Sequence, residues 1–71
     1  MALYIKELAR DPADLNTIKI ESQYDIADPR KPRTRTVYYQ YDGSSRESAW
    51  ERGWTSNHFE LVKFGYRQEE L

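Results

Sequence analysis

The sequence predicts a small, mainly β domain, and three features carry that prediction. Short segments with strand-like patterning are separated by turn signals, and the clearest of them is Thr17 to Tyr24. The dipeptide Asp42-Gly43 marks a turn. Near the end, Gly53-Trp54 leads through a polar turn into an apolar segment. We therefore predict a small β-barrel of about five short strands with one long basic loop.

Size and composition limit the possible functions. The chain has 71 residues and no cysteine, which suits a single domain over residues 1–71 with a small core. Two Trp, six Tyr and two Phe therefore supply much of the apolar contact, in the core or on a binding face. A net charge of −1 argues against a globally basic nucleic-acid binder. Neither a signal peptide nor a stretch of about 20 apolar residues is evident, so we expect a soluble, cytoplasmic protein without membrane contact.

The first half of the chain contains one clear strand. Leu3, Ile5 and Leu8 form either a helical stripe or, around residues 3–5, a short strand. Residues 11–16 are predicted to be a turn or loop because Asp11-Pro12 interrupts the pattern. In the predicted strand 17–24, every second residue faces inward: Ile18, Ile20, Ser22 and Tyr24.

Residues 25–35 form the predicted basic loop. Pro29 and Pro32 cannot donate backbone hydrogen bonds, and each restricts the residue before it. Four cations fall within six residues of this segment: Arg30, Lys31, Arg33 and Arg35. We therefore expect an exposed arm.

The second half of the chain is predicted to hold three strands, one with an alternative. Residues 36–41 alternate, with Tyr38 and Tyr39 on opposite faces. Residues 44–52 form either the return strand of a hairpin or a short helix, which would then pack on a three-stranded antiparallel sheet in an α+β fold. Residues 59–66 are predicted to be the last strand and residues 67–71 a frayed tail. Between these segments, Trp54 is expected to be buried and Trp50 partly exposed.

Two short motifs resemble those of Src homology 3 domains. Ala2-Leu3-Tyr4 is similar to the Ala-Leu-Tyr that opens many such domains, and Gly53-Trp54 followed by Ser56-Asn57 is similar to their closing motif. The resemblance covers about ten residues at the two ends and implies a small barrel. Small phage-encoded proteins of barrel type end in a similar phrase, which implies an accessory protein that modulates a host factor. Thr55-Ser56 stands where the groove proline would be, and the mid-domain Trp-Trp pair is absent. The aromatic platform that packs against a polyproline helix therefore lacks its main Trp, and the resemblance does not extend to proline-rich peptide recognition.

The sequence lacks the clustered titratable residues of an active site. His58 is the only histidine and is interpreted as a turn residue, and Cys-His catalysis is excluded. The loop aspartates at 11, 14, 25 and 28 are interpreted as caps rather than metal ligands. No glycine-rich phosphate loop is present. We therefore predict a non-enzymatic protein without cofactor or metal.

The basic arm and the neighbouring aromatic residues are the candidate binding site. The arm is either a solvated loop or a contact surface for an acidic protein partner, with nucleic acid as the alternative ligand. A homo-oligomeric structural subunit with a Trp and Tyr interface is a third hypothesis. The predicted partner-binding residues are Arg30, Lys31, Arg33, Arg35, Tyr38, Tyr39 and Trp50.

Overall fold

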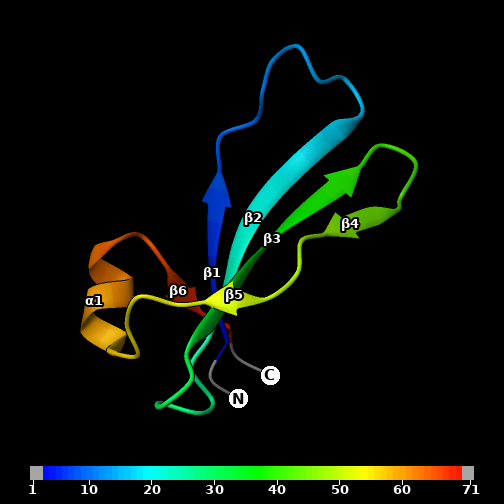
Figure 1. The fold of residues 1–71 in the computed structure, drawn as a ribbon. Helices are drawn as coiled ribbons and strands as arrows, with labels where there is room; N and C mark the ends of the chain where they lie inside the picture. Colours follow the sequence, from blue (N-terminus) through cyan, green and yellow to red (C-terminus); the bar gives the residue numbers. More distant parts are fainter. Residues whose placement is uncertain (1–2, 70–71) are drawn as a thin grey trace.

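The computed structural model describes residues 3–69 and confirms a mainly β fold (Figure 1). Six strands and one short helix follow one another along the chain. Their bounds are β1 Leu3–Leu8, β2 Thr17–Asp25, β3 Arg33–Gln40, β4 Ser45–Glu47, β5 Glu51–Arg52, α1 His58–Lys63 and β6 Arg67–Gln68. The amino-terminal segment is therefore a strand and not a helix.

All the strands belong to one antiparallel sheet. The order is β4-β3-β2-β1-β6, and β5 also pairs with β3. Within residues 3–69 no pairing joins β4 or β5 to β6, so the sheet is open where a barrel would be closed. Figure 1 shows α1 beside the lower part of the sheet, whereas the upper parts of β2, β3 and β4 extend beyond it.

Strand β2 confirms the prediction for residues 17–24, but burial does not follow the expected alternation. Ser22 and Tyr24 are buried as expected, whereas Ile18 is 51% exposed beside a register shift between Thr17 and Lys19. Glu21, on the face expected to be solvated, is only 3% exposed. A buried carboxylate requires hydrogen-bond partners, and strand β3 supplies one of them.

The basic loop is shorter than predicted, because two of its four cations lie in a strand. Residues 26–32 connect β2 to β3, and Arg33 pairs across the sheet with Asp25. Arg35 pairs with Gln23 in the same ladder. Opposite charges that face each other across an antiparallel pair, such as Arg33 and Asp25, favour strand structure. The prolines of the segment give no indication of this pairing.

Residues 44–52 confirm the hairpin and contain no helix. Gly43 has a φ of 88° in the turn before β4, a left-handed conformation that glycine adopts without strain. Strand β4 pairs Glu47 with Val37, and β5 pairs Glu51 with Thr34. Between these two pairs, β3 contributes two residues, 35 and 36, whereas the opposing segment contributes three, 48 to 50. The opposing segment therefore carries one extra residue. This bulge interrupts the edge of the sheet.

The predicted last strand is wrong: residues 58–63 form helix α1. The side chain of Asn57 accepts hydrogen bonds from the amides of Phe59 and Glu60, which caps the first turn. At the other end the amide of Gly65 donates to Val62 and that of Tyr66 to Leu61, the two bonds of a Schellman motif. Gly65 has the positive φ, 97°, that this motif favours.

The predicted frayed tail is also corrected. Arg67 and Gln68 form β6, which pairs with Ile5 and Tyr4 of β1. The amide of Glu69 donates to the carbonyl of Leu3 at 2.8 Å. Residues 70 and 71 of the predicted tail lie outside the described residues.

The core lies between the sheet and α1. Tyr4, Tyr24 and Leu61 form its buried cluster, with Ile26 and Tyr66 packed against it. The expectation that Trp54 is buried is wrong: its ring makes T-shaped contacts with Tyr24 and Phe64 but is 54% exposed. Trp50 is partly buried on the other side of the sheet.

Candidate functional site

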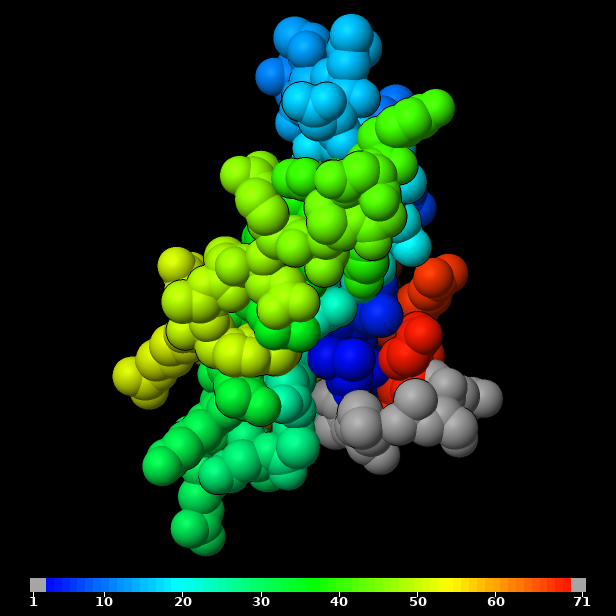
Figure 2. Space-filling model, turned by 90° about the vertical axis from the view of Figure 1, so that its right-hand side faces the viewer, coloured from blue at the N-terminus to red at the C-terminus, as the bar shows by residue number. Residues whose placement is uncertain are grey.

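A groove with a basic lining lies where the loop 26–32 meets strand β5. The groove has a volume of about 540 Å³. Figure 2 shows the segment around residue 50 (yellow) directly above the segment around residue 30 (green). The amide of Gly53 donates to the carbonyl of Pro32 at 2.8 Å, which joins the two walls. The lining residues are Arg30, Lys31, Pro32, Arg33, Trp50, Glu51 and Arg52.

The loop that forms one wall is held by its own aspartates. Asp25 accepts the amide of Ala27 at 2.8 Å, and Asp28 accepts the amide of Arg30 at 3.0 Å. The amide of Lys31 also donates to the carbonyl of Asp28. These turns fix the backbone that presents the two loop cations, so the wall is largely formed before any ligand binds.

Most of the cations in the groove are not neutralised within residues 3–69. Arg33 is the exception: its Nη2 lies 2.9 Å and its Nε 3.2 Å from one carboxylate oxygen of Asp25. Burial raises the pKa of Asp25, but the Ala27 amide and the Arg33 guanidinium together outweigh burial and hold that pKa below its usual value. Arg30, Lys31 and Arg52 are exposed and form no ion pair with a described residue. The groove therefore attracts anions.

Trp50 forms the aromatic part of the groove. The guanidinium carbons of Arg33 and Arg35 each lie 4.5 Å from the centroid of its ring. Cation–π contacts at this distance orient the indole and add to the positive potential around it. Trp50 is partly buried, so one part of its surface remains accessible from the groove.

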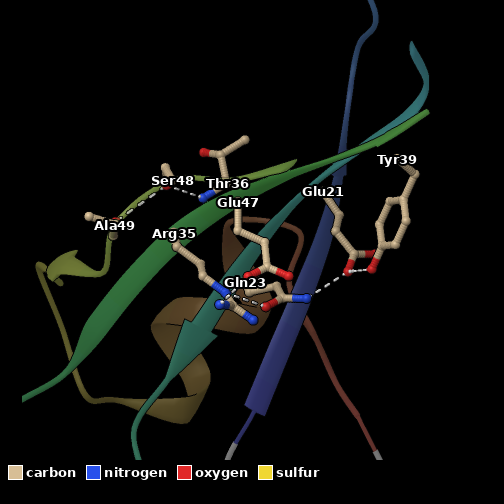
Figure 3. A network of polar contacts seen from close by, with 8 residues as sticks. All are labelled: Glu21, Gln23, Arg35, Thr36, Tyr39, Glu47, Ser48 and Ala49. Carbon is tan, nitrogen blue, oxygen red and sulfur yellow. Dashed lines mark hydrogen bonds and ion pairs between the residues drawn. The ribbon is translucent and has the colours of Figure 1, made fainter. Parts of the chain in front are cut away.

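Arg35, whose guanidinium contacts the ring of Trp50, belongs to a polar network on the sheet (Figure 3). The Nε of Arg35 donates to the side-chain oxygen of Gln23 at 2.8 Å, and its Nη1 lies 3.2 Å from Glu47. Gln23 in turn donates to Glu21 at 2.9 Å. Tyr39 donates to the same Glu21 oxygen at 2.8 Å. Side chains on three strands are thereby linked on one face of the sheet.

The buried carboxylate in this network is held in its charged form. Burial raises the pKa of Glu21, but hydrogen bonds from Gln23 and Tyr39 and the charge of Lys19 together lower it below its usual value. The hydrogen bond between Tyr39 and Glu21 raises the pKa of the Tyr39 hydroxyl. Burial and the negative charge of Glu21 add to this effect. The network is thus a rigid support, because each buried polar group in it has a partner.

The structure brings together some of the predicted site residues and separates others. Four of them line the groove: Arg30, Lys31, Arg33 and Trp50. Arg35 contacts Trp50 but does not line the groove. Tyr39 is bound to Glu21 further along the sheet, and the alternation of the strand places Tyr38 on the opposite face, where its ring contacts Arg46.

Sequence reasoning missed Glu51 and Arg52. They enter the groove because β5 pairs with β3, which sets Arg52 opposite Arg33. The two residues are 19 positions apart, and nothing in the local pattern indicates this pairing. In the sequence, Arg52 lies between Glu51 and Gly53, and no turn or charge motif distinguishes it.

The other titratable residues show local roles. His58 contacts the hydroxyl of Tyr4 through Nδ1. Asp11 accepts the amide of Ala13, and Asp14 accepts the hydroxyl of Thr17. Within residues 3–69 no three His, Cys, Asp or Glu side chains are grouped to hold a metal ion.

Comparisons with models of known protein families, with curated proteins and with solved structures found no match to this chain. Across the described part of the chain, no helix combines the length and the apolar character needed to cross a membrane.

Proposed function

We propose that this chain is a non-enzymatic interaction module that binds an acidic segment of a protein partner in the basic groove. The observation that supports the proposal is the gathering of Arg30, Lys31 and Arg52 around Trp50, without an acidic partner for these cations in residues 3–69. Trp and Arg are the residue types most often found at binding hot spots.

The dimensions of the groove suit a short peptide segment. A volume of about 540 Å³ falls within the range of small-ligand and peptide sites. Its walls are held by backbone hydrogen bonds at Gly53 and Asp28, which limits the entropy lost on binding. Exposed arginines offer paired donors to carboxylates, and the indole ring supplies an apolar contact.

A protein ligand is favoured over nucleic acid by the positions of the aromatic residues. Base stacking needs accessible rings beside the cations. Of the three predicted aromatic residues, Tyr39 is bound to Glu21 and Tyr38 lies on the other face, so only Trp50 remains beside the cations.

A capture experiment with charge reversals tests this function. The tagged protein is incubated with nuclease-treated lysate, and bound proteins are identified by mass spectrometry. We expect one stoichiometric partner that is retained after nuclease treatment and lost when Arg30→Glu and Arg52→Glu are combined. Arg46→Glu, which makes one such charge reversal outside the groove, is the control, because Arg46 is exposed on the opposite face and forms no ion pair within residues 3–69.

Two results would contradict the proposal. Loss of all binding after nuclease treatment, together with a steep salt dependence for a generic duplex, would indicate nucleic acid instead. Equal loss of the partner in Arg46→Glu and in the double variant would show that overall charge, and not the groove, determines binding.

A further inference from the structure

The side of β5 that faces away from β3 is an unpaired strand edge at the basic groove. On its inner side, β5 pairs Glu51 with Thr34 and Arg52 with Arg33 of β3. On its outer side, no strand of residues 3–69 pairs with β5, and both of its residues are exposed. We call this side the outer edge of β5. A strand edge of this kind is a template for pairing with another chain.

The backbone of Arg52 directs its hydrogen-bonding groups to the outer edge. The amide of Gly53 donates to the carbonyl of Pro32, so the backbone of residue 53 faces the segment that leads into β3. In an antiparallel pair, residues that exchange hydrogen bonds with the partner strand alternate with residues that do not. Arg52 precedes Gly53 and therefore turns its amide and its carbonyl away from β3. Both groups are available to an added strand.

The side chain of the same residue points into the groove. Arg52 lies directly opposite Arg33, and side chains that are opposite one another in an antiparallel pair lie on the same face of the sheet. Arg33 contacts the ring of Trp50, and all three residues line the groove. The Arg52 guanidinium has no ion-pair partner in the described part of the chain. One residue thus offers backbone groups along the edge and a cation on the groove face.

We propose that the acidic segment of the partner binds as an extended strand, antiparallel to β5, with an acidic residue at every second position. This inference rests on the proposed function and specifies the conformation and the sequence pattern of the ligand. Side chains of a strand alternate between its two faces, so only alternate residues of the added strand face the cations. Main-chain hydrogen bonds to the edge contribute affinity, and the alternating side chains determine specificity.

The charge at the outer edge favours this ligand over a second copy of the chain. Two antiparallel β5 strands paired about Arg52 would place two arginines opposite each other, which is destabilising. An acidic residue opposite Arg52 forms a charge-assisted hydrogen bond instead. Arg30 and Lys31 on the loop wall of the groove also have no ion-pair partner within residues 3–69. More than one acid of the added strand therefore has a cation to contact.

Two peptides of identical composition test the sequence pattern. Both consist of glutamate and threonine with blocked ends. Glutamate alternates with threonine in the first peptide, and the glutamates are contiguous in the second. We expect the full chain to bind the alternating peptide about two- to fivefold more tightly in titrations followed by NMR, because an extended contiguous run directs some of its glutamates away from the cations. The amide of Arg52 should also exchange more slowly with solvent when the alternating peptide is bound.

A pair of substitutions at residue 52 separates the backbone contact from the charge. Arg52→Ala and Arg52→Pro both remove the cation, but only proline also removes the backbone donor. Because this N–H faces the outer edge, proline costs no hydrogen bond to β3. We expect Arg52→Pro to bind the alternating peptide about two- to tenfold more weakly than Arg52→Ala does.

Circular dichroism verifies that both variants are folded. If Arg52→Pro does not fold, methylation of peptide nitrogens replaces it, with the unchanged chain as the binding protein. In an antiparallel pair the residue opposite Arg52 exchanges hydrogen bonds with it, and its side chain lies on the groove face. N-methylation of the central glutamate should therefore weaken binding, whereas N-methylation of an adjacent threonine should not.

The outcomes distinguish this inference from the proposed function. Equal affinity for the two peptides overturns the strand-addition mode, and so does equal binding by Arg52→Ala and Arg52→Pro, although the groove then still binds acidic segments. Equal effects of the two N-methylations overturn it as well. If neither peptide binds, or if combined Arg30→Glu and Arg52→Glu changes leave the binding of both peptides unaltered, the proposed function fails and this inference with it.

Discussion

The hydroxyl of Tyr24 forms two hydrogen bonds with the backbone of Thr55: it donates to the carbonyl oxygen at 2.6 Å and accepts from the amide at 2.7 Å. Tyr24 is completely buried in the centre of the sheet, and Thr55 lies in the segment between β5 and α1. This one side chain therefore ties the segment that leads to the helix onto the core.

Tyr24→Phe removes both hydrogen bonds and leaves two backbone groups of Thr55 without their partner. We expect the free energy of unfolding to fall by about 1–3 kcal/mol in urea denaturation, and the amide of Thr55 to exchange faster with solvent. Tyr41→Phe is the control, because Tyr41 is 81% exposed. Similar losses in both variants would show that the contact with Thr55 contributes nothing specific.

Gly53→Ala is expected to destabilise the fold because of the same tyrosine. A Cβ atom at residue 53 would lie 2.3 Å from the Tyr24 hydroxyl oxygen and 2.6 Å from the ring carbon that carries it. A buried ring cannot move away freely, so we expect a loss of about 1–3 kcal/mol.

The loss at Gly53 should be smaller when the hydroxyl of Tyr24 has been removed, since the closest atom is then absent. A double-mutant cycle with Tyr24→Phe measures this coupling. Strict additivity of the two changes would contradict the steric explanation.

Arg35→Ala is expected to cost more stability than Arg33→Ala. Both side chains lie at the same distance from Trp50, but only Arg35 binds the buried Gln23. Loss of that partner costs about 1–3 kcal/mol. The Arg33 side chain is 52% exposed, and its ion pair with Asp25 is worth at most about 1 kcal/mol. Chemical denaturation of both variants decides the order, and the reverse order would refute the supporting role of the network.

Stability is expected to decrease as the pH falls through the range in which Glu21 and Asp25 are protonated. In the folded chain, both carboxyl groups have a pKa below the ordinary value. That ordinary value is 4.5 for a glutamate such as Glu21 and 3.8 for an aspartate such as Asp25. The unfolded chain then binds more protons, so the stabilisation is complete above the unfolded pKa and is lost as the pH falls through the folded pKa.

Urea denaturation at several values between about pH 6 and pH 3 measures this dependence. Glu21→Gln should flatten the profile, although it also lowers stability at neutral pH. Glu60→Gln removes an exposed carboxylate and serves as the control. An unchanged profile in Glu21→Gln would contradict the assignment.

Several elements could be predicted from the sequence because their signals are local. Alternation over residues 17–24 indicates β2, and Asp42-Gly43 indicates the turn in which Gly43 adopts a positive φ. The helix at residues 58–63 also had a local signal, namely Asn57 as the cap and Gly65 after the last turn. These residues were outweighed by the apolar pattern of 59–66, which over so few residues fits a strand and a helix equally well.

The candidate site could be predicted only in part. The basic residues 30, 31 and 33 and Trp50 are conspicuous in the sequence, and the groove contains all of them. Arg52 joins them only through strand pairing, and Tyr38 is excluded by the face on which it lies. Long-range register therefore determines which of the conspicuous residues act together.

The mainly β character, the hairpin turn and the cluster of basic residues can all be predicted from the sequence, because period-two patterning and turn chemistry act between near neighbours. The open sheet, the burial of Glu21 and the groove that Trp50 shares with the loop 26–32 become visible only in the folded chain. Each of these depends on contacts between residues distant in the chain, where the partners of a polar or aromatic side chain set its burial and its role.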